Sequence, residues 1–250
     1  MNTSRKLLAE SLGTAILLCT VVGSGIMAQR LASGNDALAL LANAIATGTS
    51  LFVLIVCFST FSGAHFNPVV SMVDYLRGGL SRRLLGLYVL SQIVGGFLGV
   101  FAAHFMFELP VVEASQHIRT GPSQWFSEYL ATAGLVLVIL LCEEYHKTKV
   151  PQIVAAYVIA AYWFTSSTSF ANPAVTLARA FTDTFSGIRL CDTGPFIICQ
   201  SFGALSGLAL ARIFSAKLSE EEQLRLRLER DSYQLGDRMI SEASVVNSDL

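Results

Sequence analysis

Two short segments about a hundred residues apart have nearly the same sequence, and this duplication limits the folds open to the chain. One contains Asn67-Pro68 and the other contains Asn172-Pro173, each after a long uncharged stretch. Asn is a favoured helix N-cap, and Pro suits the first helical position, so each pair predicts the start of a helix. A helix that begins inside lipid-soluble sequence is tolerated only where it lines a cavity. The duplication therefore predicts a pore entered by two half-helices.

The composition indicates a membrane protein. Hydrophobic residues make up 53% of the chain and charged residues 14%, with a mean hydropathy of +0.56, which is too apolar for an ordinary soluble domain. A helix needs about 20 apolar residues to cross a hydrocarbon core. Six stretches qualify, at about 7–28, 37–60, 84–107, 125–142, 151–167 and 193–214. The net charge of -1 gives no sign of nucleic-acid binding, and the five cysteines lack metal-ligand spacing, so we expect neither a metal nor another cofactor.

The chain is a duplicated unit whose landmarks recur in the same order. Each half has a Glu-x-x-x-Thr pair in its first span, an Asn-Pro box after its second and a Gln followed by small residues in its third. The paired landmarks are Glu10 and Glu128, Asn67 and Asn172, and Gln92 and Gln200. Three spans is an odd number, so the halves must lie in opposite orientations around a site near the midplane. We expect an all-α membrane protein with six transmembrane helices and two re-entrant half-helices in an inverted 3+3 repeat.

This organisation predicts five segments along the chain. They are a cytoplasmic N-terminus (1–6), a first repeat (7–107), an extracellular connecting loop (108–124), a second repeat (125–215) and a polar cytoplasmic tail (216–250). Lys and Arg in the loops divide nine to four between the two sides, which places both termini in the cytoplasm. The tail has eight acids against five bases and predicts a short surface helix followed by a disordered end.

The two boxes, the six spans and the duplicated glutamates resemble the aquaporin (major intrinsic protein) family over about residues 5–215. The first box departs from the family pattern, because Val69 stands where Ala is usual. The resemblance implies half-helices at about 67–77 and 172–182 that enter from opposite faces, with the amides of Asn67 and Asn172 donating to the pore. It also implies a homotetramer in a lipid bilayer, and we expect a bacterial inner membrane.

Glu10 and Glu128 lie within predicted spans, where carboxylates are functional candidates by default. One interpretation is a proton relay. The other, which the resemblance favours, is that each carboxylate accepts backbone N–H groups of a re-entrant loop. We expect His65, beside the first box, to brace its loop as well.

The predicted selectivity filter is the unusual part of the chain. Counting from the two Asn residues, the family's four constriction positions are Thr47, Ala160, Ser169 and Val175. Val175 stands where the family usually has Arg, and Thr47 and Ala160 stand where water-selective members carry an aromatic residue and a His. The lining is therefore wider and less cationic than usual. Arg179 comes one helical turn after Val175 and could reach the mouth, but we do not expect it to replace the missing guanidinium.

These features predict a passive channel for small neutral solutes and not an enzyme. The filter resembles that of bacterial aquaglyceroporins associated with arsenic resistance, which implies glycerol, water and arsenite or methylated arsenicals as solutes. A water-selective aquaporin is the alternative, followed by an ion channel or a proton-coupled transporter, and a purely structural membrane protein also stays open. An intramembrane enzyme would need a metal site or a nucleophile with a base within the spans, and the sequence shows neither.

Overall fold

The computed structural model describes residues 2–215 and Leu228, and in this part the chain is helical without any strand. Eight α-helices follow in order: α1 (Thr3–Leu31), α2 (Asp36–Ser62), α3 (Pro68–Leu76), α4 (Arg82–Met106), α5 (Pro122–Tyr145), α6 (Val150–Phe164), α7 (Pro173–Ala178) and α8 (Leu190–Ser215). Two short 3₁₀ helices, η1 (Lys147–Lys149) and η2 (Arg179–Phe181), precede α6 and follow α7. Met1–Ala211 form one compact unit, and Arg212–Leu250 are assigned to a second. Apart from Leu228, the expected polar tail (216–250) lies outside the described residues.

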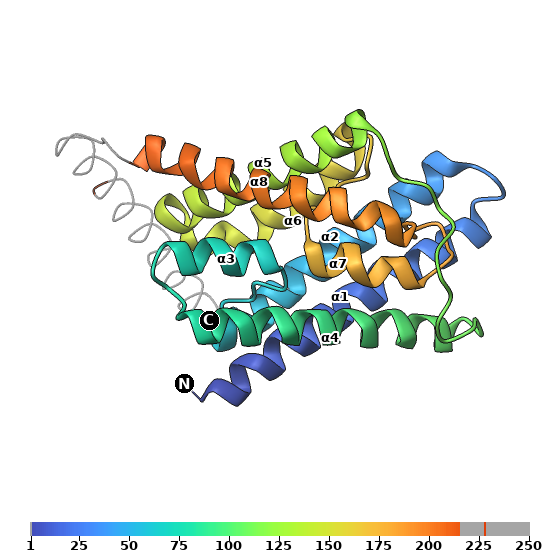
Figure 1. Cartoon of the computed structure of the whole chain (residues 1–250), viewed down its shortest axis with the longest axis horizontal. Helices are drawn as coiled ribbons and strands as arrows, with labels where there is room; N and C mark the ends of the chain where they lie inside the picture. The colour runs from blue at the N-terminus through green and yellow to red at the C-terminus, as the bar shows by residue number, and fades with distance from the viewer. Residues whose placement is uncertain (1, 216–227, 229–250) are drawn as a thin grey trace, which may run out of the picture. The chain divides into compact units, whose positions relative to one another are not determined.

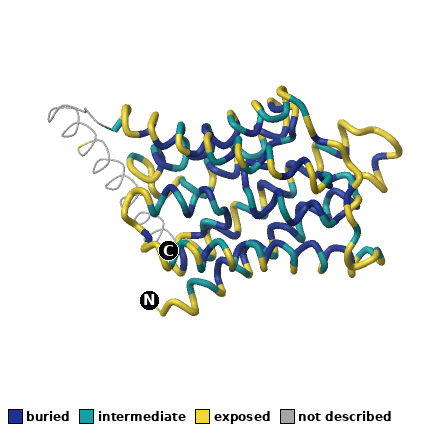
Figure 2. Tube along the Cα trace, in the orientation of Figure 1, coloured by how far each residue is buried: buried dark blue, intermediate teal, exposed yellow. Residues whose placement is uncertain are grey.

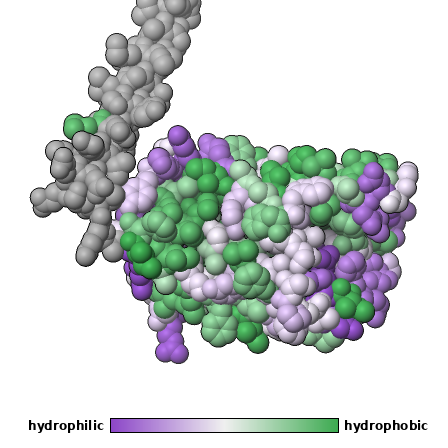
Figure 3. Space-filling view, turned by 90° about the horizontal axis from the view of Figure 1, so that it is seen from above, coloured by the Kyte–Doolittle hydropathy of each residue, from purple (hydrophilic) through white to green (hydrophobic). Residues whose placement is uncertain are grey.

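Five of these helices, α1, α2, α4, α5 and α8, are long and apolar enough to cross a membrane. The sixth expected span, 151–167, is helical only as far as Phe164, because Thr165 is extended and leads into the second box loop. With 15 residues, α6 reaches about 22 Å at 1.5 Å per residue. Figure 3 shows hydrophobic side chains over the middle of one face and hydrophilic ones toward its ends.

The half-helices α3 and α7 lie in the middle of the fold (Figure 1), between α4 on one side and α5 and α8 on the other. Each begins with Pro directly after its Asn N-cap. Their N-terminal ends meet at the centre, and they then run in opposite directions. The predicted inverted repeat of six spans and two half-helices is therefore confirmed.

Glycines allow the outer helices to approach closely enough to enclose the half-helices. A Cβ on Gly95 or Gly99 of α4 would collide with the backbone carbonyls of Ser11 or Ala15 in α1. Gly203 and Gly207 of α8 make the equivalent approach to Tyr129 and Ala133 in α5. Small residues at such crossings are typical of membrane helices. In Figure 2 buried and exposed positions alternate along the helices, so that one side of each faces the interior.

The loops that lead into the half-helices have strained backbones in matching places. Ala64 and Phe66 have φ angles of 53° and 48°, and Ser169 and Ala171 have 49° and 45°. These residues stand three and one positions before Asn67 and Asn172. Non-glycine residues rarely adopt this left-handed conformation, which costs about 1–3 kcal/mol and persists only where the surroundings hold it. The two loops therefore depend on bonds from the neighbouring helices.

Candidate functional site: a central cavity between two box loops

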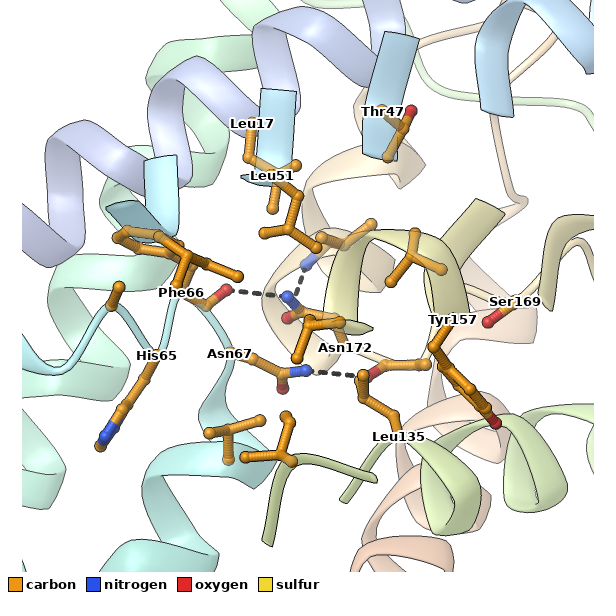
Figure 4. A pocket seen from close by; sticks show the side chains of 18 of the residues that line it. Leu17, Thr47, Leu51, His65, Phe66, Asn67, Leu135, Tyr157, Ser169 and Asn172 are labelled. Carbon is orange, nitrogen blue, oxygen red and sulfur yellow. Dashed lines mark hydrogen bonds between the residues drawn. The ribbon is translucent and has the colours of Figure 1, made fainter. Parts of the chain in front are cut away.

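The two box asparagines bind each other's loops at the centre of the fold. The Asn67 side chain accepts from the backbone N–H of Val69 and donates to the carbonyl of Ala171 at 2.8 Å. The Asn172 side chain accepts from Ala174 and Val175 and donates to the carbonyl of Phe66, also at 2.8 Å. Figure 4 shows this reciprocal pair beside the cavity. An amide group has two N–H donors, so each asparagine keeps one that is not committed to the opposite loop.

The helix starts add an electrostatic bias to the same place. Each half-helix begins at the cavity, and a helix N-terminus carries roughly half a positive charge. Two such ends at one level favour a passing oxygen as hydrogen-bond acceptor and disfavour cations. The centre of the cavity is therefore suited to polar but uncharged molecules.

Glu10 and Glu128 are fully buried, and each holds one box loop. The Glu10 carboxylate accepts from the backbone N–H groups of His65 at 3.0 Å and Phe66 at 2.7 Å, and also from Ser62 and Gln92. The Glu128 carboxylate accepts from Phe170 and Ala171, both at 2.9 Å, and from Gln200 at 2.6 Å. Neither residue lines the cavity.

His65 and Phe170 occupy equivalent places, each two residues before its box asparagine, but they do different work. His65 lines the cavity, its Nδ1 lies 3.0 Å from the Ser71 hydroxyl, and its Nε2 lies 3.8 Å from an Asp74 carboxylate oxygen. Phe170 instead offers its ring to arginine side chains. The duplicated halves thus differ in chemistry where their backbones match.

Three of the four expected filter residues line the cavity: Thr47 of α2, Ser169 of the second box loop and Val175 of α7. Ala160 does not. The cavity-facing side of α6 is built by Val150, Val154, Tyr157, Val158 and Tyr162. Ala160 is two residues, or about 200° of helix rotation, from both Val158 and Tyr162, and it is exposed on the other side of α6.

Tyr162 takes the place expected for Ala160. Its hydroxyl donates to the Thr47 hydroxyl at 3.2 Å, and both side chains are buried at the cavity wall. The cavity wall on this side therefore carries an aromatic ring with a hydroxyl and not the methyl group of Ala160.

Arg179 also differs from the expectation, because it reaches the cavity. Its side chain is 2% exposed, its Nε donates to the carbonyl of Ser186, and its Cζ lies 3.5 Å from the centre of the Phe170 ring. α7 ends at Ala178, and Arg179 begins η2, so the tightened turn carries the side chain back over the loop. The guanidinium absent from position 175 is supplied four residues later.

Sequence reasoning missed Tyr162 and Phe170 and dismissed Arg179. The signal for Tyr162 was present in the spacing of Val150, Val154 and Val158 along one helix face. No comparable signal marks Arg179, because its direction depends on where α7 gives way to the 3₁₀ turn.

This geometry and the comparisons with known proteins define the same class. A family model described as "Major intrinsic protein" matches residues 1–167. The chain therefore belongs to the major intrinsic protein family, whose members are integral membrane channels.

Individual relatives agree with this assignment. The chain is 53% identical over 211 residues to "Aquaglyceroporin AqpS" of Rhizobium meliloti (strain 1021), covering 84% of this chain and 90% of that protein. It is 30% identical over 155 residues to "Aquaporin Lacbi1:233199" of Laccaria bicolor, covering 54% and 57% of the two chains. The X-ray structure of the aquaglyceroporin from Plasmodium falciparum shares the fold with a TM-score of 0.69 at 19% identity, covering 89% of this chain and all of that one.

Proposed function

We propose that the protein is a passive channel for small neutral solutes with several hydroxyl groups. Water, glycerol and uncharged trivalent arsenic, as As(OH)₃ or its methylated forms, are the solutes we assign to it. The observation that carries the proposal is the reciprocal pair Asn67–Ala171 and Asn172–Phe66 at the meeting point of two half-helices. It presents fixed donors to a solute oxygen without offering a charge that would trap it.

The walls of the cavity support amphipathic solutes. Hydrogen-bonding groups come mainly from the two box loops, whereas α1, α2 and α5 contribute aliphatic side chains. The aliphatic members are Leu17, Val21, Leu51, Ile55, Leu135 and Ile139. A polyol or a methylated arsenic hydroxide can direct its oxygens to the loops and its methyl or methylene groups to this wall. An ion would lose its hydration shell against the same wall without compensation.

The bonding of the buried carboxylates speaks against a proton-coupled transporter. The oxygens of Glu10 and Glu128 accept from loop N–H groups and from Gln92 and Gln200. Glu143, which does line the cavity, is paired with Arg77 at 2.7 Å. A group that shuttles protons through the pore would need an oxygen free to face it, and neither Glu10 nor Glu128 lines the cavity.

A water-selective channel is the second candidate, and two observations favour it. Tyr162 adds an aromatic ring at the constriction, and Arg179 returns a guanidinium to it. An aromatic residue at the constriction is typical of the water-selective members of the family, and a guanidinium there is usual in the family as a whole. Against this, Val175 and Ser169, which also line the cavity, have small side chains.

We also place the channel in a bacterial inner membrane as a homotetramer with one pore per protomer and both termini in the cytoplasm. Large apolar side chains exposed on the outer helix faces, such as Leu130 and Phe202, suit contact with lipid or with a second copy.

The test is stopped-flow light scattering on proteoliposomes exposed to gradients of water, glycerol and arsenite. We expect all three to cross faster than in empty vesicles, linearly with concentration and independently of membrane potential. Water flux with glycerol and arsenite excluded would establish the second candidate. Uptake that collapses with a protonophore, or a large current in ordinary salts, would refute a passive neutral-solute channel.

A further inference from the structure

We propose that two arginines from different segments, Arg179 after α7 and Arg119 of the 107–121 loop, together form the barrier that excludes cations at the outer constriction. This inference rests on the proposed function and adds to it the residues that set charge selectivity. Both guanidinium groups lie over the ring of Phe170, with Cζ at 3.5 Å for Arg179 and 5.1 Å for Arg119.

Arg179 lines the cavity and keeps most of its hydrogen-bond donors uncommitted within the described residues. Among the described residues only Ser186 accepts a hydrogen bond from it, through Nε. The guanidinium has five N–H groups, so the terminal amino groups remain for whatever passes. Arg179 lines the cavity together with Val175 and Ser169, which places this charge where position 175 has none.

Arg119 is buried behind the constriction and fixes the loops around it. It is 7% exposed, and it donates to the carbonyls of Gly187 at 2.8 Å, Ser167 at 3.2 Å and Phe185 at 3.4 Å. These acceptors belong to the second box loop and to the segment that follows η2. Burial lowers the pKa of Arg119 to about 10, which still leaves the group charged at pH 7. Arg119 therefore acts both as a second charge and as a positioning residue.

The two charges are only partly compensated. In the part of the chain that the structure describes, no carboxylate forms a salt bridge with either arginine. Glu128 is near enough to attract both, but its oxygens are engaged by Phe170, Ala171 and Gln200. One buried carboxylate opposite two guanidinium groups leaves a net positive charge beside the pore.

The experiment compares proton leak with glycerol flux in proteoliposomes of wild type, Arg179→Gln and Arg119→Gln. A potassium gradient with valinomycin drives protons inward, a trapped pH-sensitive dye reports them, and light scattering reports glycerol. A unit charge about 6–12 Å from the path, at an effective dielectric constant near 20, changes cation passage by roughly tenfold to a hundredfold. We expect a rise in leak of this size for Arg179→Gln and a smaller rise for Arg119→Gln, each expressed relative to the glycerol flux of the same variant.

Three further variants separate charge from structure. Arg119→Lys keeps the charge but cannot reproduce the three carbonyl bonds, and we expect its leak to stay near wild type. Adding Val175→Arg to Arg179→Gln returns a guanidinium to the constriction and should reverse most of the leak. Arg30→Gln is the matched control, because Arg30 also stacks on a phenylalanine and donates to a carbonyl but is exposed on α1.

Wild-type proton leak in both Arg179→Gln and Arg119→Gln, with glycerol still passing, would overturn the proposal, as would an equal leak in Arg30→Gln. If Arg179→Gln is not monodisperse in detergent, Arg119→Gln decides alone, and an unchanged leak overturns the proposal. A wild type that passes no glycerol refutes the proposed function instead, and the leak of each variant relative to wild type still tests the barrier.

Discussion

Replacing Glu128 by Gln tests whether the buried carboxylates hold the box loops or relay protons. Glu128 accepts three hydrogen bonds, from the backbone of Phe170 and Ala171 and from Gln200. A carboxamide of the same shape has one oxygen, so its NH₂ group must face either Phe170 N–H or Ala171 N–H. In both cases one buried backbone donor loses its acceptor, and the bonds that remain no longer involve a charge.

The magnitude follows from those losses. An unpaired buried donor costs about 1–3 kcal/mol, and each remaining bond weakens by about 1 kcal/mol when its acceptor becomes neutral. Relief of the desolvation of a buried charge offsets part of this sum. We therefore expect Glu128→Gln to lower the free energy of unfolding by about 3 kcal/mol, and Glu128→Ala, which loses all three bonds, to prevent stable folding.

The assay is denaturation of the purified protein in mild detergent, followed by glycerol flux of the folded fraction in proteoliposomes. Glu143→Gln is the control for the stability measurement alone, because Glu143 forms an exposed pair with Arg77 and such pairs contribute about 0–1 kcal/mol. Wild-type stability in Glu128→Gln together with a loss of flux would refute the loop-holding role and favour proton transfer through the carboxylate.

Three more predictions concern the pore and the 107–121 loop. Asn172→Asp keeps the acceptor for Ala174 but places a carboxylate oxygen against the Phe66 carbonyl, so it should lower the free energy of unfolding and raise the cation leak measured as current. Asn35→Asp, at the N-cap of α2, is the control and should do neither. Equal currents in the two variants would exclude a pore role for the amide of Asn172. Val175→Arg adds a guanidinium beside Arg179 and Thr47→Phe adds bulk, so both should abolish glycerol and arsenite flux before water flux in a solute-size series; an unchanged size dependence would place the constriction elsewhere. Burial, with the nearby Arg119 and Arg179, lowers the pKa of His117 in the folded protein. Below about pH 6.5 the unfolded chain therefore binds this proton more readily than the folded one, and wild-type stability falls with decreasing pH. Thermal denaturation between pH 7.5 and 5 should show a smaller fall in His117→Gln, and identical profiles in the two proteins would contradict this prediction.

The architecture could be predicted from the sequence because it depends on residue types at fixed spacings. Asn-Pro signals a helix start wherever it occurs, and its repetition after two uncharged stretches already implied two half-helices. The paired glutamates and glutamines, such as Glu10 with Gln92, stand at corresponding positions because each pair holds an equivalent loop. Local chemistry and global fold agree at these positions, so a short motif was sufficient to predict where each half-helix begins.

The constriction could not be predicted in the same way, because it depends on helix rotation across irregular segments. Counting back from Asn172 to α6 crosses residues 165–171, which are not helical. The count therefore does not tell which side of α6 a residue lies on. Tyr162, two residues after the predicted Ala160, is the residue of α6 that lines the cavity beside Thr47.

The exchange at Arg179 shows why a missing residue type in a motif is weak evidence of a missing function. Val175 removes the guanidinium from the usual position, and from the sequence this reads as an uncharged, wide filter. In the structure the 3₁₀ turn after Ala178 returns a guanidinium to the same cavity, and Phe170 provides the surface on which it rests. Position 179 lies four residues after position 175, about one helical turn, and its long side chain reaches the same cavity. The charge at a pore constriction therefore depends on all the loops that meet there and not on one motif position. In this chain those loops include the one that carries Arg119, which is why we expect changes far from the Asn-Pro boxes to alter ion exclusion.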